Sequence, residues 1–332
     1  MNADLNTAIA ARLAWVAVDW GSSNLRAWAM TDDGQVLARS ASDKGMLSLT
    51  PEAYETTLRE VIGAWLPATG SVDVLVCGMA GARQGWREAA YLPIPTRLDD
   101  LARGAVTPPV ADPRLRVYLL PGLSQGREER ERDDAGRDFD VMRGEETQLA
   151  GLVAGEPGFS GHVCLPGTHA KWARLEDGAV AGFETYLTGE LYRLLAAQSV
   201  LHHSVGDDDL DAPACREAFV AAVRESHDAP EGFTRQLFAL RAADLLDTTL
   251  PPGEARRARL AARLSGLAIG LELAGACRML PADESVTLIG TEDLCRRYAL
   301  ALEALGIGSR YQDAETAVLA GLGLARTALR ST

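Results

Sequence analysis

The sequence predicts an α/β fold in which one strand-rich unit occurs twice. In the first unit, an apolar run at Trp15–Asp19 ends in the small-residue turn Gly21-Ser22-Ser23 and resumes as a strand at Leu25–Met30. The second unit has the same order of strand, small-residue turn and further strands, at His162–Leu165, Pro166-Gly167-Thr168, Lys171–Leu175 and Ala179–Phe183. The two units share an architecture without a literal sequence repeat, and we interpret them as a duplication.

The rest of the first half alternates strands with helices. The turn Asp32-Asp33-Gly34 is typical of a hairpin and predicts a returning strand at Val36–Ser40. Thr50-Pro51 is typical of a helix N-cap followed by the first helical residue, so a helix is expected from there to about Trp65. Two buried strands and another helix are expected at Val72–Cys77, at Val117–Leu120 and from Gly144 to about Val153. The charged run Arg127–Arg137 is expected to be a solvated loop, because such a run has no apolar face to bury.

The second half becomes helical after Gly189. Its expected elements are helices at about 189–199, 213–226, 233–248 and 254–279, a strand at Val286–Gly290, a helix from Glu292 and a terminal helix from about Asp313. The longest of these helices contains Gly266, Gly270 and Gly275. Because a glycine inside a helix costs about 1 kcal/mol relative to alanine, we expect another backbone to pack closely against these positions.

The composition is that of an ordinary soluble globular protein long enough for two compact domains. Of the 332 residues, 47% are hydrophobic and 24% are charged, and the formal net charge is −13. Nucleic acid and anionic membrane surfaces are not expected partners of so acidic a chain, because both need basic patches. A local pocket can still bind a small anion against the overall field.

Targeting, membrane and disulfide signals are absent from the sequence. The segment Met1–Leu13 does not have the pattern of a secretory signal, and no stretch has the ~20 apolar residues of a membrane span. We therefore expect a cytoplasmic protein. The five cysteines are far apart and form no CxxC pair, which indicates neither a zinc site nor a disulfide framework. The oligomeric state is left open, a homodimer included.

Two glycine-containing turns have the composition of phosphate-binding loops. Little side-chain bulk lets backbone N–H groups reach phosphate oxygens, and a nearby carboxylate can hold hydrated Mg²⁺. Asp19 and the turn Gly21-Ser22-Ser23 supply both features, and Gly167-Thr168 supplies a second small turn. Either turn alone could be a simple hairpin, but two in equivalent places of a duplicated unit favour phosphate binding. The sequence contains neither GxxxxGKS/T nor GxGxxG, which argues against a P-loop and a Rossmann site.

Four longer motifs carry a resemblance to a known family. They are DWGSSNLRAW at 19–28, VMRGEETQ at 141–148, LPGTHAKW at 165–172 and TGEL at 188–191. These motifs are similar to those of the 2-dehydro-3-deoxygalactonokinase family, which belongs to the superfamily of actin and hexokinase. The resemblance extends from about Trp15 to Arg326, which is nearly the whole chain.

The resemblance implies a duplicated ribonuclease H-like fold, as in actin and hexokinase, with mixed sheets in two lobes and a cleft between the lobes. The N-terminal lobe, 1–143, is expected to hold the first phosphate loop and the sugar-acid contacts. The C-terminal lobe, 144–332, is expected to hold the second phosphate loop and the adenosine loop, and its terminal helix either stays there or crosses back. The implied activity is ATP- and Mg²⁺-dependent phosphorylation of 2-dehydro-3-deoxy-D-galactonate at O6, in galactonate catabolism.

The resemblance also implies how a nucleotide would be bound. Asp19 would organise Mg²⁺, while Gly21, Ser22 and Ser23 would contact the β- and γ-phosphates. The second phosphate loop would consist of Gly167 and Thr168. The pair Gly290-Thr291, at the end of a strand and the start of a helix, resembles the adenosine loop.

Contacts with the sugar acid are implied for another group of residues, namely Met79, Gly81, Arg83, Trp86, Arg143 and His169. A guanidinium binds a carboxylate through two parallel hydrogen bonds, so Arg143 suits the acid group, although an ion pair with Glu145 or Glu146 is equally compatible. The family tends to have Ser-Asn where this chain has Ala82-Arg83. That departure removes support for a polar sugar contact there, although Arg83 could itself meet the acid group. Structural roles for Trp86 and His169 also stay open.

The general base is expected at the helix start Gly144-Glu145-Glu146. Related sugar kinases place an Asp after a Gly at a helix N-terminus, where it can accept the proton of the substrate hydroxyl, and this chain has Glu in place of that Asp. We favour Glu145, then Glu146, with Glu190 of another Gly-Glu helix start as a third candidate. Carboxylates in a first helical turn also stabilise the helix dipole, so a purely structural role stays open.

Two other functions stay open on the sequence alone. The same fold could phosphorylate a related hexonate or a hexose, because Ala82-Arg83 departs from the family pattern. The alternative of another class is a nucleotide- or sugar-binding regulator without turnover. The acidic charge and the short segment before Trp15 argue against a regulator that carries a DNA-binding module.

Overall fold

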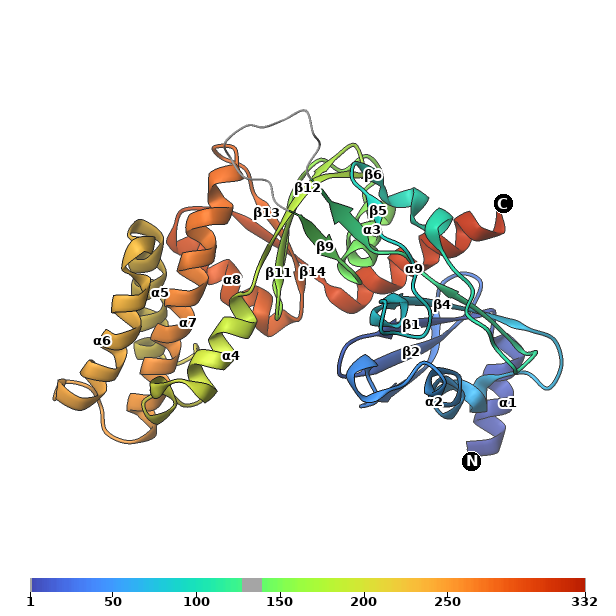
Figure 1. The fold of residues 1–332 in the computed structure, drawn as a ribbon, viewed down its shortest axis with the longest axis horizontal. Coiled ribbons are helices and arrows are strands. Elements are labelled where there is room, and N and C mark those ends of the chain that lie inside the picture. Colours follow the sequence, from blue (N-terminus) through green and yellow to red (C-terminus); the bar gives the residue numbers. More distant parts are fainter. Residues whose placement is uncertain (1, 127–138, 332) are drawn as a thin grey trace. The chain divides into compact units, whose positions relative to one another are not determined.

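The computed structural model describes residues 2–126 and 139–331, which Figure 1 traces in colour. The loop predicted at Arg127–Arg137 lies outside the described residues. The chain divides into two units. Unit 1 comprises Met1–Ser160, Leu175–Gly182 and Ala314–Thr332, and unit 2 comprises Gly161–Arg174 and Phe183–Asp313. The lobe boundary predicted between 143 and 144 stays a prediction.

A five-stranded sheet of order β3-β2-β1-β4-β7 forms the centre of unit 1. Its strands are β1 Trp15–Trp20, β2 Leu25–Met30, β3 Val36–Ser42, β4 Val72–Gly78 and β7 Leu115–Leu119. β1 pairs antiparallel with β2 and parallel with β4, and β4 pairs parallel with β7. β1 and β4 are buried along nearly their whole length, as expected for apolar runs in the middle of a sheet. The carboxyl ends of β1, β4 and β7 therefore lie at one edge of the sheet.

A second sheet, of order β14-β13-β10-β11-β12-β6, repeats the plan of the first. Its strands are β6 Thr96–Arg97, β10 Gly161–Leu165, β11 Ala170–Glu176, β12 Ala179–Tyr186, β13 Val286–Gly290 and β14 Ser309–Asp313. The order β12-β11-β10-β13-β14 corresponds to β3-β2-β1-β4-β7, and β13 pairs parallel with both β10 and β14. The predicted α/β fold with a duplicated strand unit is confirmed. The hairpin end of β11 and β12 belongs to unit 1, where β12 pairs with β6.

The remaining elements of unit 1 are mostly short. The helices are α1 Asn2–Arg12, α2 Ala53–Ile62, α3 Glu145–Gly155 and α9 Ala314–Arg330. A small sheet consists of β5 Leu92–Pro93, β8 Leu123–Gln125 and β9 Asp140–Met142. The 3₁₀ turns are η1 Met46–Ser48, η2 Gly63–Trp65, η3 Met79–Gly81 and η4 Leu98–Gly104. Unit 2 adds α4 Thr188–Gln198, α5 Pro213–Asp228, α6 Phe233–Leu246, α7 Glu254–Ala276 and α8 Glu292–Ala304, with the 3₁₀ turns η5 Val200–His203, η6 Pro230–Gly232 and η7 Cys277–Met279.

Some elements differ from the sequence prediction. The N-cap expected at Thr50 is wrong, because α2 begins at Ala53, and the carbonyl of Thr50 accepts the Ala53 N–H within a preceding turn. The strand β14 was not expected. Its sequence, Ser-Arg-Tyr-Gln-Asp, is polar and has no buried position, so it lacks the apolar alternation by which strands are predicted.

α5, α6 and α7 lie side by side in unit 2 (Figure 1). A Cβ atom on Gly266 or Gly270 of α7 would overlap the backbone carbonyl oxygen of Phe219 or Val223 in α5. The close backbone packing predicted for these two glycines is confirmed. Gly275 instead faces a side chain, because a Cβ there would lie 2.8 Å from the Tyr186 hydroxyl.

The segment Glu254–Met279, which joins α7 and η7, is long and apolar enough to cross a membrane by length and composition. From the sequence we expected no segment with the length and composition of a membrane span, so that expectation is wrong for this helix. Of its most apolar window, 78% is buried inside the protein. The apolar residues of this helix are therefore used in core packing, which is the usual place for such side chains in a folded domain.

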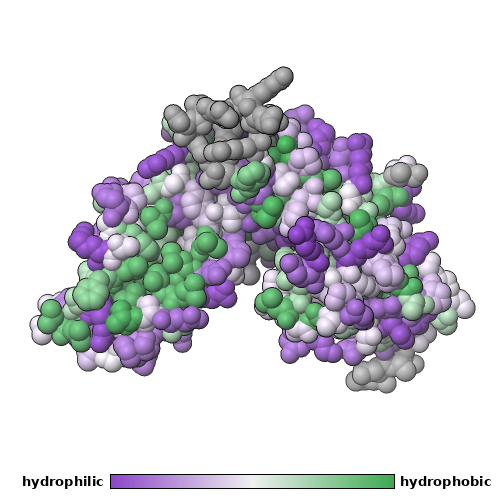
Figure 2. Space-filling view, in the orientation of Figure 1, coloured by the Kyte–Doolittle hydropathy of each residue, from purple (hydrophilic) through white to green (hydrophobic). Residues whose placement is uncertain are grey.

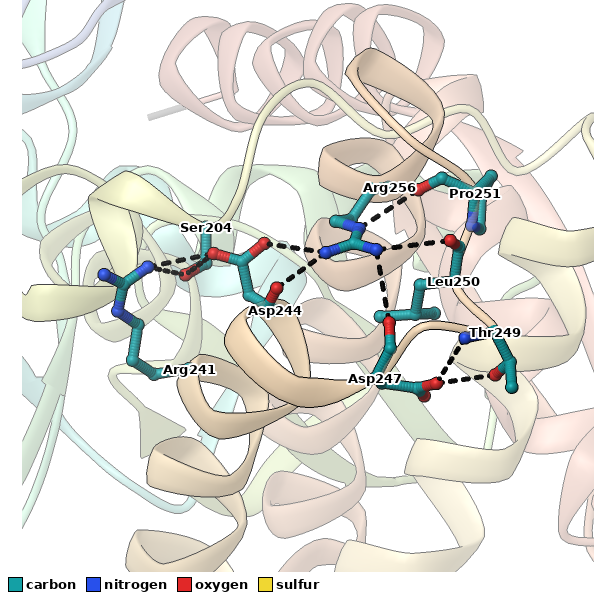
Figure 3. A network of polar contacts seen from close by, with 8 residues as sticks. All are labelled: Ser204, Arg241, Asp244, Asp247, Thr249, Leu250, Pro251 and Arg256. Atoms are coloured by element: carbon teal, nitrogen blue, oxygen red, sulfur yellow. Dashed lines mark hydrogen bonds and ion pairs between the residues drawn. The ribbon is translucent and has the colours of Figure 1, made fainter.

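Arg256 fixes the connection between α6 and α7 (Figure 3). Its guanidinium donates hydrogen bonds to a group of backbone carbonyl oxygens, those of Asp244, Asp247, Leu250 and Pro251. The last carbonyls of a helix have no partner within the helix. Arg256 therefore satisfies the end of α6 and orders the loop that follows it.

Hydrophobic side chains gather on the surface of the helical part of unit 2 (Figure 2). The exposed ones are Leu187, Leu194, Val200, Phe238, Leu245 and Leu246. Large exposed apolar patches often mark interaction sites. A homodimer stays a prediction.

α3 and α9 pack against each other in unit 1 through two glycines. A Cβ atom on Gly151 would overlap the Ala317 carbonyl oxygen, and one on Gly321 would overlap the Thr147 carbonyl oxygen. Only glycine permits so close an approach of two helical backbones. This contact fixes the position of α3, whose first turn carries Glu145 and Glu146.

Two alanine substitutions in α9 test this contact. Gly321→Ala should lower the free energy of unfolding by roughly 1–3 kcal/mol or more, because the added methyl forces α9 away from α3. Gly323→Ala is the matched control on the same helix, because no heavy atom lies within 4 Å of its added Cβ. That control should raise the free energy of unfolding by up to about 1 kcal/mol. Urea unfolding of both variants measures the difference, and equal effects would contradict the contact.

Candidate functional site

Three backbone segments meet at the carboxyl edge of the unit 1 sheet. Trp20 at the end of β1 pairs with Gly78 at the end of β4. A Cβ atom on Gly78 would lie 2.7 Å from the Trp20 carbonyl oxygen and 3.5 Å from Asp19 Oδ1. A Cβ on Gly144, which precedes α3, would lie 3.5 Å from the Gly78 Cα. The edge therefore brings together Asp19 and the first turn of α3, as expected for a site at the ends of parallel strands.

The turn after Asp19 is held by backbone hydrogen bonds. Gly21 N–H donates to the Asn24 carbonyl, and the Gly21 and Ser22 carbonyls accept the N–H groups of Met46 and Leu47. Ser22 is partly exposed and Ser23 is exposed. The turn is a defined loop whose serines face solvent.

Asp19 forms an ion pair with Arg26 on the neighbouring strand, with Asp19 Oδ2 2.5 Å from Arg26 Nη2. Its side chain is 21% exposed, so a ligand can reach it. In the described part of the chain, no group of three or more His, Cys, Asp or Glu side chains could hold a metal ion alone. Mg²⁺ in kinase sites keeps several waters and is held by one or two carboxylates together with nucleotide phosphates. A single partly exposed carboxylate therefore fits an ion that arrives with the nucleotide.

Glu145 and Glu146 have different environments although they are adjacent. Glu146 is fully buried, and its carboxylate accepts hydrogen bonds from Gly144 N–H at 2.7 Å and from the Thr147 hydroxyl at 3.0 Å. Burial and the neighbouring charge of Glu145 raise the pKa of Glu146 to about 8. Glu145 is only partly buried, and its carboxylate accepts the Arg143 N–H at 3.0 Å. Of the two, Glu145 is the carboxylate that a ligand can touch.

Arg143 is a buried cation with unused hydrogen-bonding capacity. Its guanidinium donates one hydrogen bond, from Nη2 to the Ala89 carbonyl at 2.7 Å, and lies over the Tyr91 ring at 4.3 Å from the centroid. Gly81 leaves room for it, because a Cβ there would lie 2.9 Å from Nη1. Nε and Nη1 are buried without a hydrogen-bond partner among the residues that the structure describes. A buried unsatisfied cation is costly, so these atoms call for an anionic or polar ligand.

The other residues predicted to contact the sugar acid are spread more widely. Trp86 is buried in the core, where its ring stacks on Tyr54 at 5.8 Å between centroids. Arg83 is highly exposed and forms an ion pair with Glu88. Met79 is partly buried in η3. Tyr91, which holds Arg143, was not singled out from the sequence, because it lies in an irregular segment without a motif.

The second predicted phosphate turn lies in unit 2 against the start of α4. A Cβ on Gly189 would overlap the Gly167 carbonyl oxygen, and Glu190 N–H donates to the Thr168 carbonyl at 2.9 Å. His169 Nε2 lies 2.6 Å from Glu190 Oε2, with both side chains partly exposed. Glu190, the third candidate for the base, is therefore engaged by His169. The sequence did not predict that residue 189 must be glycine, because the requirement arises from its contact with the Gly167 carbonyl in the folded chain.

The predicted adenosine loop lies beside this turn. Gly290 ends β13, and a Cβ there would lie 3.7 Å from Pro166 Cδ and 2.9 Å from Cys295 Sγ. Thr291 is exposed at the N-terminus of α8. The turn before Gly167 and the end of β13 therefore form one neighbourhood in unit 2.

Comparison with known proteins identifies relatives along nearly the whole chain. Residues 19–325 match the family described as 2-keto-3-deoxy-galactonokinase. The chain is 42% identical over 315 residues to the probable 2-dehydro-3-deoxygalactonokinase DgoK1 of Rhizobium meliloti (strain 1021), covering 95% of this chain and 97% of that protein. It is 32% identical over 308 residues to the 2-dehydro-3-deoxygalactonokinase of Escherichia coli (strain K12), covering 93% and 96%.

A solved structure has the same fold. It is the crystal structure of a protein from Sinorhizobium meliloti assigned as a 2-dehydro-3-deoxygalactonokinase, with a TM-score of 0.83 and 39% sequence identity. The match covers 95% of this chain and 99% of that one.

The burial of Glu146 predicts a pH-dependent stability. Because its pKa rises from 4.5 to about 8 on folding, the folded state keeps a proton that the unfolded state releases. Its contribution to stability is therefore undiminished below pH about 4.5, falls as the pH rises to about 8, and is then constant. Glu146→Gln removes the titration, while its amide oxygen can accept the Gly144 N–H and its amide NH2 can donate to the Thr147 hydroxyl oxygen. The variant should gain up to about 5 kcal/mol over the wild type by pH 8 and little at pH 4.5.

Thermal and urea unfolding between pH 4.5 and pH 9 measure this difference. Glu156→Gln, which changes an exposed residue at the other end of the same helix, is the matched control. A difference between Glu146→Gln and the wild type that does not change with pH would contradict a neutral Glu146 in the fold.

Proposed function

The chain belongs to the 2-keto-3-deoxy-galactonokinase family, and on this premise we propose that it transfers the γ-phosphoryl group of ATP to O6 of 2-dehydro-3-deoxy-D-galactonate. The observation that carries the proposal is the match of residues 19–325 to that family, with 42% identity to a curated relative over 95% of the chain. A kinase of one small metabolite is consistent with the cytoplasmic location that we also propose.

The reaction is a displacement at phosphorus. The O6 hydroxyl attacks the γ-phosphorus, the new O6–P bond forms, and the bond from phosphorus to the β,γ-bridging oxygen breaks, so that ADP leaves. The hydroxyl proton passes to a carboxylate. Most of the rate enhancement in such reactions comes from positioning and from stabilising charge on the phosphoryl oxygens, so the arrangement of the donors matters more than the base.

We assign the nucleotide contacts to the turns already described. Asp19 would hold a hydrated Mg²⁺, which supplies charge neutralisation on the phosphates when bound. Gly21, Ser22 and Ser23 would contact the β- and γ-phosphates, with Gly167 and Thr168 as the second phosphate loop. Gly290 and Thr291 would lie against the nucleoside. Two observations support this assignment. Ser23 and Thr291 are exposed, and the carboxylate of Asp19 is partly exposed, so a nucleotide and its ion can reach these residues.

Glu145 is the residue that we assign as the general base. Its carboxylate is partly exposed, whereas Glu146 is buried and has a pKa raised to about 8. A carboxyl group that is protonated at neutral pH cannot accept the hydroxyl proton. Glu146 instead accepts the Gly144 N–H and thereby shapes the loop that presents Glu145.

Arg143 is the residue that we assign to the substrate carboxylate. Two of its buried nitrogens, Nε and Nη1, have no hydrogen-bond partner in the described part of the chain. Nε–H and the Nη1 N–H groups point to different edges of the guanidinium, so each can donate a separate charge-assisted hydrogen bond to an oxygen of the substrate. Gly81 and Met79 lie on the same η3 turn beside it and would contact the sugar chain.

A coupled assay of ADP release with a panel of acids tests the function. The wild type should turn over 2-dehydro-3-deoxy-D-galactonate faster than other aldonic and 2-keto-3-deoxy acids, and the product should carry phosphate at O6. Asp19→Asn should nearly abolish turnover, and Glu145→Gln should lower kcat roughly 10²–10⁴-fold while preserving the KM for ATP. Folded, monodisperse wild-type protein that releases no ADP with any acid of the panel would overturn the proposal.

Substitution of Arg143 tests recognition of the carboxylate. Arg143→Lys keeps the charge but loses the planar guanidinium donors Nε and Nη1, so kcat/KM for the acid should fall roughly 10–1000-fold with the KM for ATP unchanged. With the amide of the same sugar acid as substrate, wild type and variant should differ little. Arg83→Lys is the control, because Arg83 is exposed and paired with Glu88. A larger loss for Arg83→Lys than for Arg143→Lys would move the assignment to Arg83.

A further inference from the structure

Glu272 is a buried carboxylate in the middle of the apolar helix α7. It is 2% exposed, and its hydrogen-bond partners are three neutral side-chain donors from three different elements. Trp172 Nε1 of β11 donates to Oε1 at 2.7 Å, and the Tyr298 hydroxyl of α8 donates to Oε2 at 2.8 Å. The third donor is the hydroxyl of Thr188, the first residue of α4.

Each of these donors lies on an element that adjoins, along the chain, a segment assigned to nucleotide binding. Thr188 precedes Gly189, which lies against the Gly167 carbonyl, and Glu190, whose N–H donates to Thr168. Trp172 lies on β11, the strand that begins directly after the phosphate turn. Tyr298 is on α8, which begins directly after Gly290-Thr291.

A buried carboxylate without a cation is expensive, and burial raises the pKa of Glu272 while the three hydrogen bonds lower it. A hydrophobic residue would pack in this helix at lower cost. The carboxylate is the side chain that can accept from three donors at once, because its two oxygens offer about four acceptor positions. Its geometry therefore serves to join three elements rather than to stabilise α7.

We propose that Glu272 is a positioning residue for nucleotide binding, which holds the start of α4 and the middle of α8 in register with β11. The proposal rests on the assignment of the nucleotide to the turns 166–169 and 290–291. Glu272 itself would touch neither substrate. Its loss should separate the phosphate turn from the adenosine loop and weaken nucleotide binding, with little effect on recognition of the sugar acid.

Glu272→Leu and Glu272→Gln test this role. Glu272→Leu should raise the KM for ATP and the Kd for Mg-ADP at least tenfold and leave the KM for the sugar acid within twofold. Glu272→Gln should stay within about threefold of the wild type. Its amide oxygen still accepts from Trp172, which can only donate, and the two hydroxyls can rotate to suit the amide group. Rescue by glutamine distinguishes hydrogen-bonded positioning from charge.

The control is Gln236→Leu, which replaces another buried polar side chain of unit 2, on α6. It should change the melting temperature without changing the Kd for Mg-ADP. An unchanged Kd in folded Glu272→Leu would overturn the proposal, as would equal losses for ATP and for the sugar acid.

If Glu272→Leu does not fold, variants that each remove one hydrogen-bond donor to Glu272 test the proposal instead. Thr188→Val should weaken Mg-ADP more than adenosine, because Thr188 adjoins the phosphate turn. Tyr298→Phe should weaken adenosine and Mg-ADP alike, because Tyr298 lies on the helix after the adenosine loop. Unchanged affinities in both variants would overturn the proposal.

Direct nucleotide binding by calorimetry separates this inference from the proposed reaction. If the wild type binds Mg-ADP and the variants lose it, the role of Glu272 stands even where no sugar acid is phosphorylated. If the wild type binds no nucleotide, both the role of Glu272 and the kinase function are overturned.

Discussion

The approach of three backbones at Gly78 is the constraint on which the unit 1 site depends. Gly78 has φ 88°, a conformation that favours glycine, and a Cβ there would press on the Trp20 carbonyl and approach Asp19. Gly144, with φ 107°, lies against the same Cα. The distance between Asp19 on β1 and Glu145 on α3 is therefore set by two missing side chains. The α3–α9 glycine contact, at Thr147 and Gly151 of α3, then holds the helix in this position.

The same geometry separates two adjacent glutamates. Successive helical residues point about 100° apart, so Glu145 is partly exposed while Glu146 is directed into the protein, where it accepts the Gly144 N–H. Burial then keeps Glu146 protonated near neutral pH. This arrangement avoids a third negative charge beside Asp19 and Glu145, where the phosphates of the nucleotide would have to approach. On the assignment proposed above, a motif of two glutamates would provide one carboxylate for chemistry and one neutral carboxyl for structure.

The parts of the fold that were predicted are those encoded by short, contiguous stretches of sequence. Strands such as Val72–Gly78 and Val286–Gly290 are continuous apolar runs, and the duplication followed from the order of strands and turns. The surroundings of Arg143 could not be predicted, because Gly81, Ala89 and Tyr91 meet it from about fifty or more residues away in the sequence. Glu272 left a signal, a single acid within an apolar helical stretch, but its three partners are distant in sequence and only the fold joins them. How the predicted site residues contact a bound ligand depends on residues that are distant in the sequence, and no local sequence pattern encodes those contacts.

An acidic chain that binds two anions must solve an electrostatic problem. With a net charge of −13, the overall field repels both a nucleotide and a sugar acid. The residues assigned to phosphate are small, and they offer backbone N–H groups and hydroxyls instead of a row of cations. The assigned acid receptor is one guanidinium, which is buried and therefore screened little by solvent. Binding would then depend on short-range, oriented donors. The neutral carboxyl of Glu146 meets the same requirement, because it adds no negative charge beside Asp19 and Glu145.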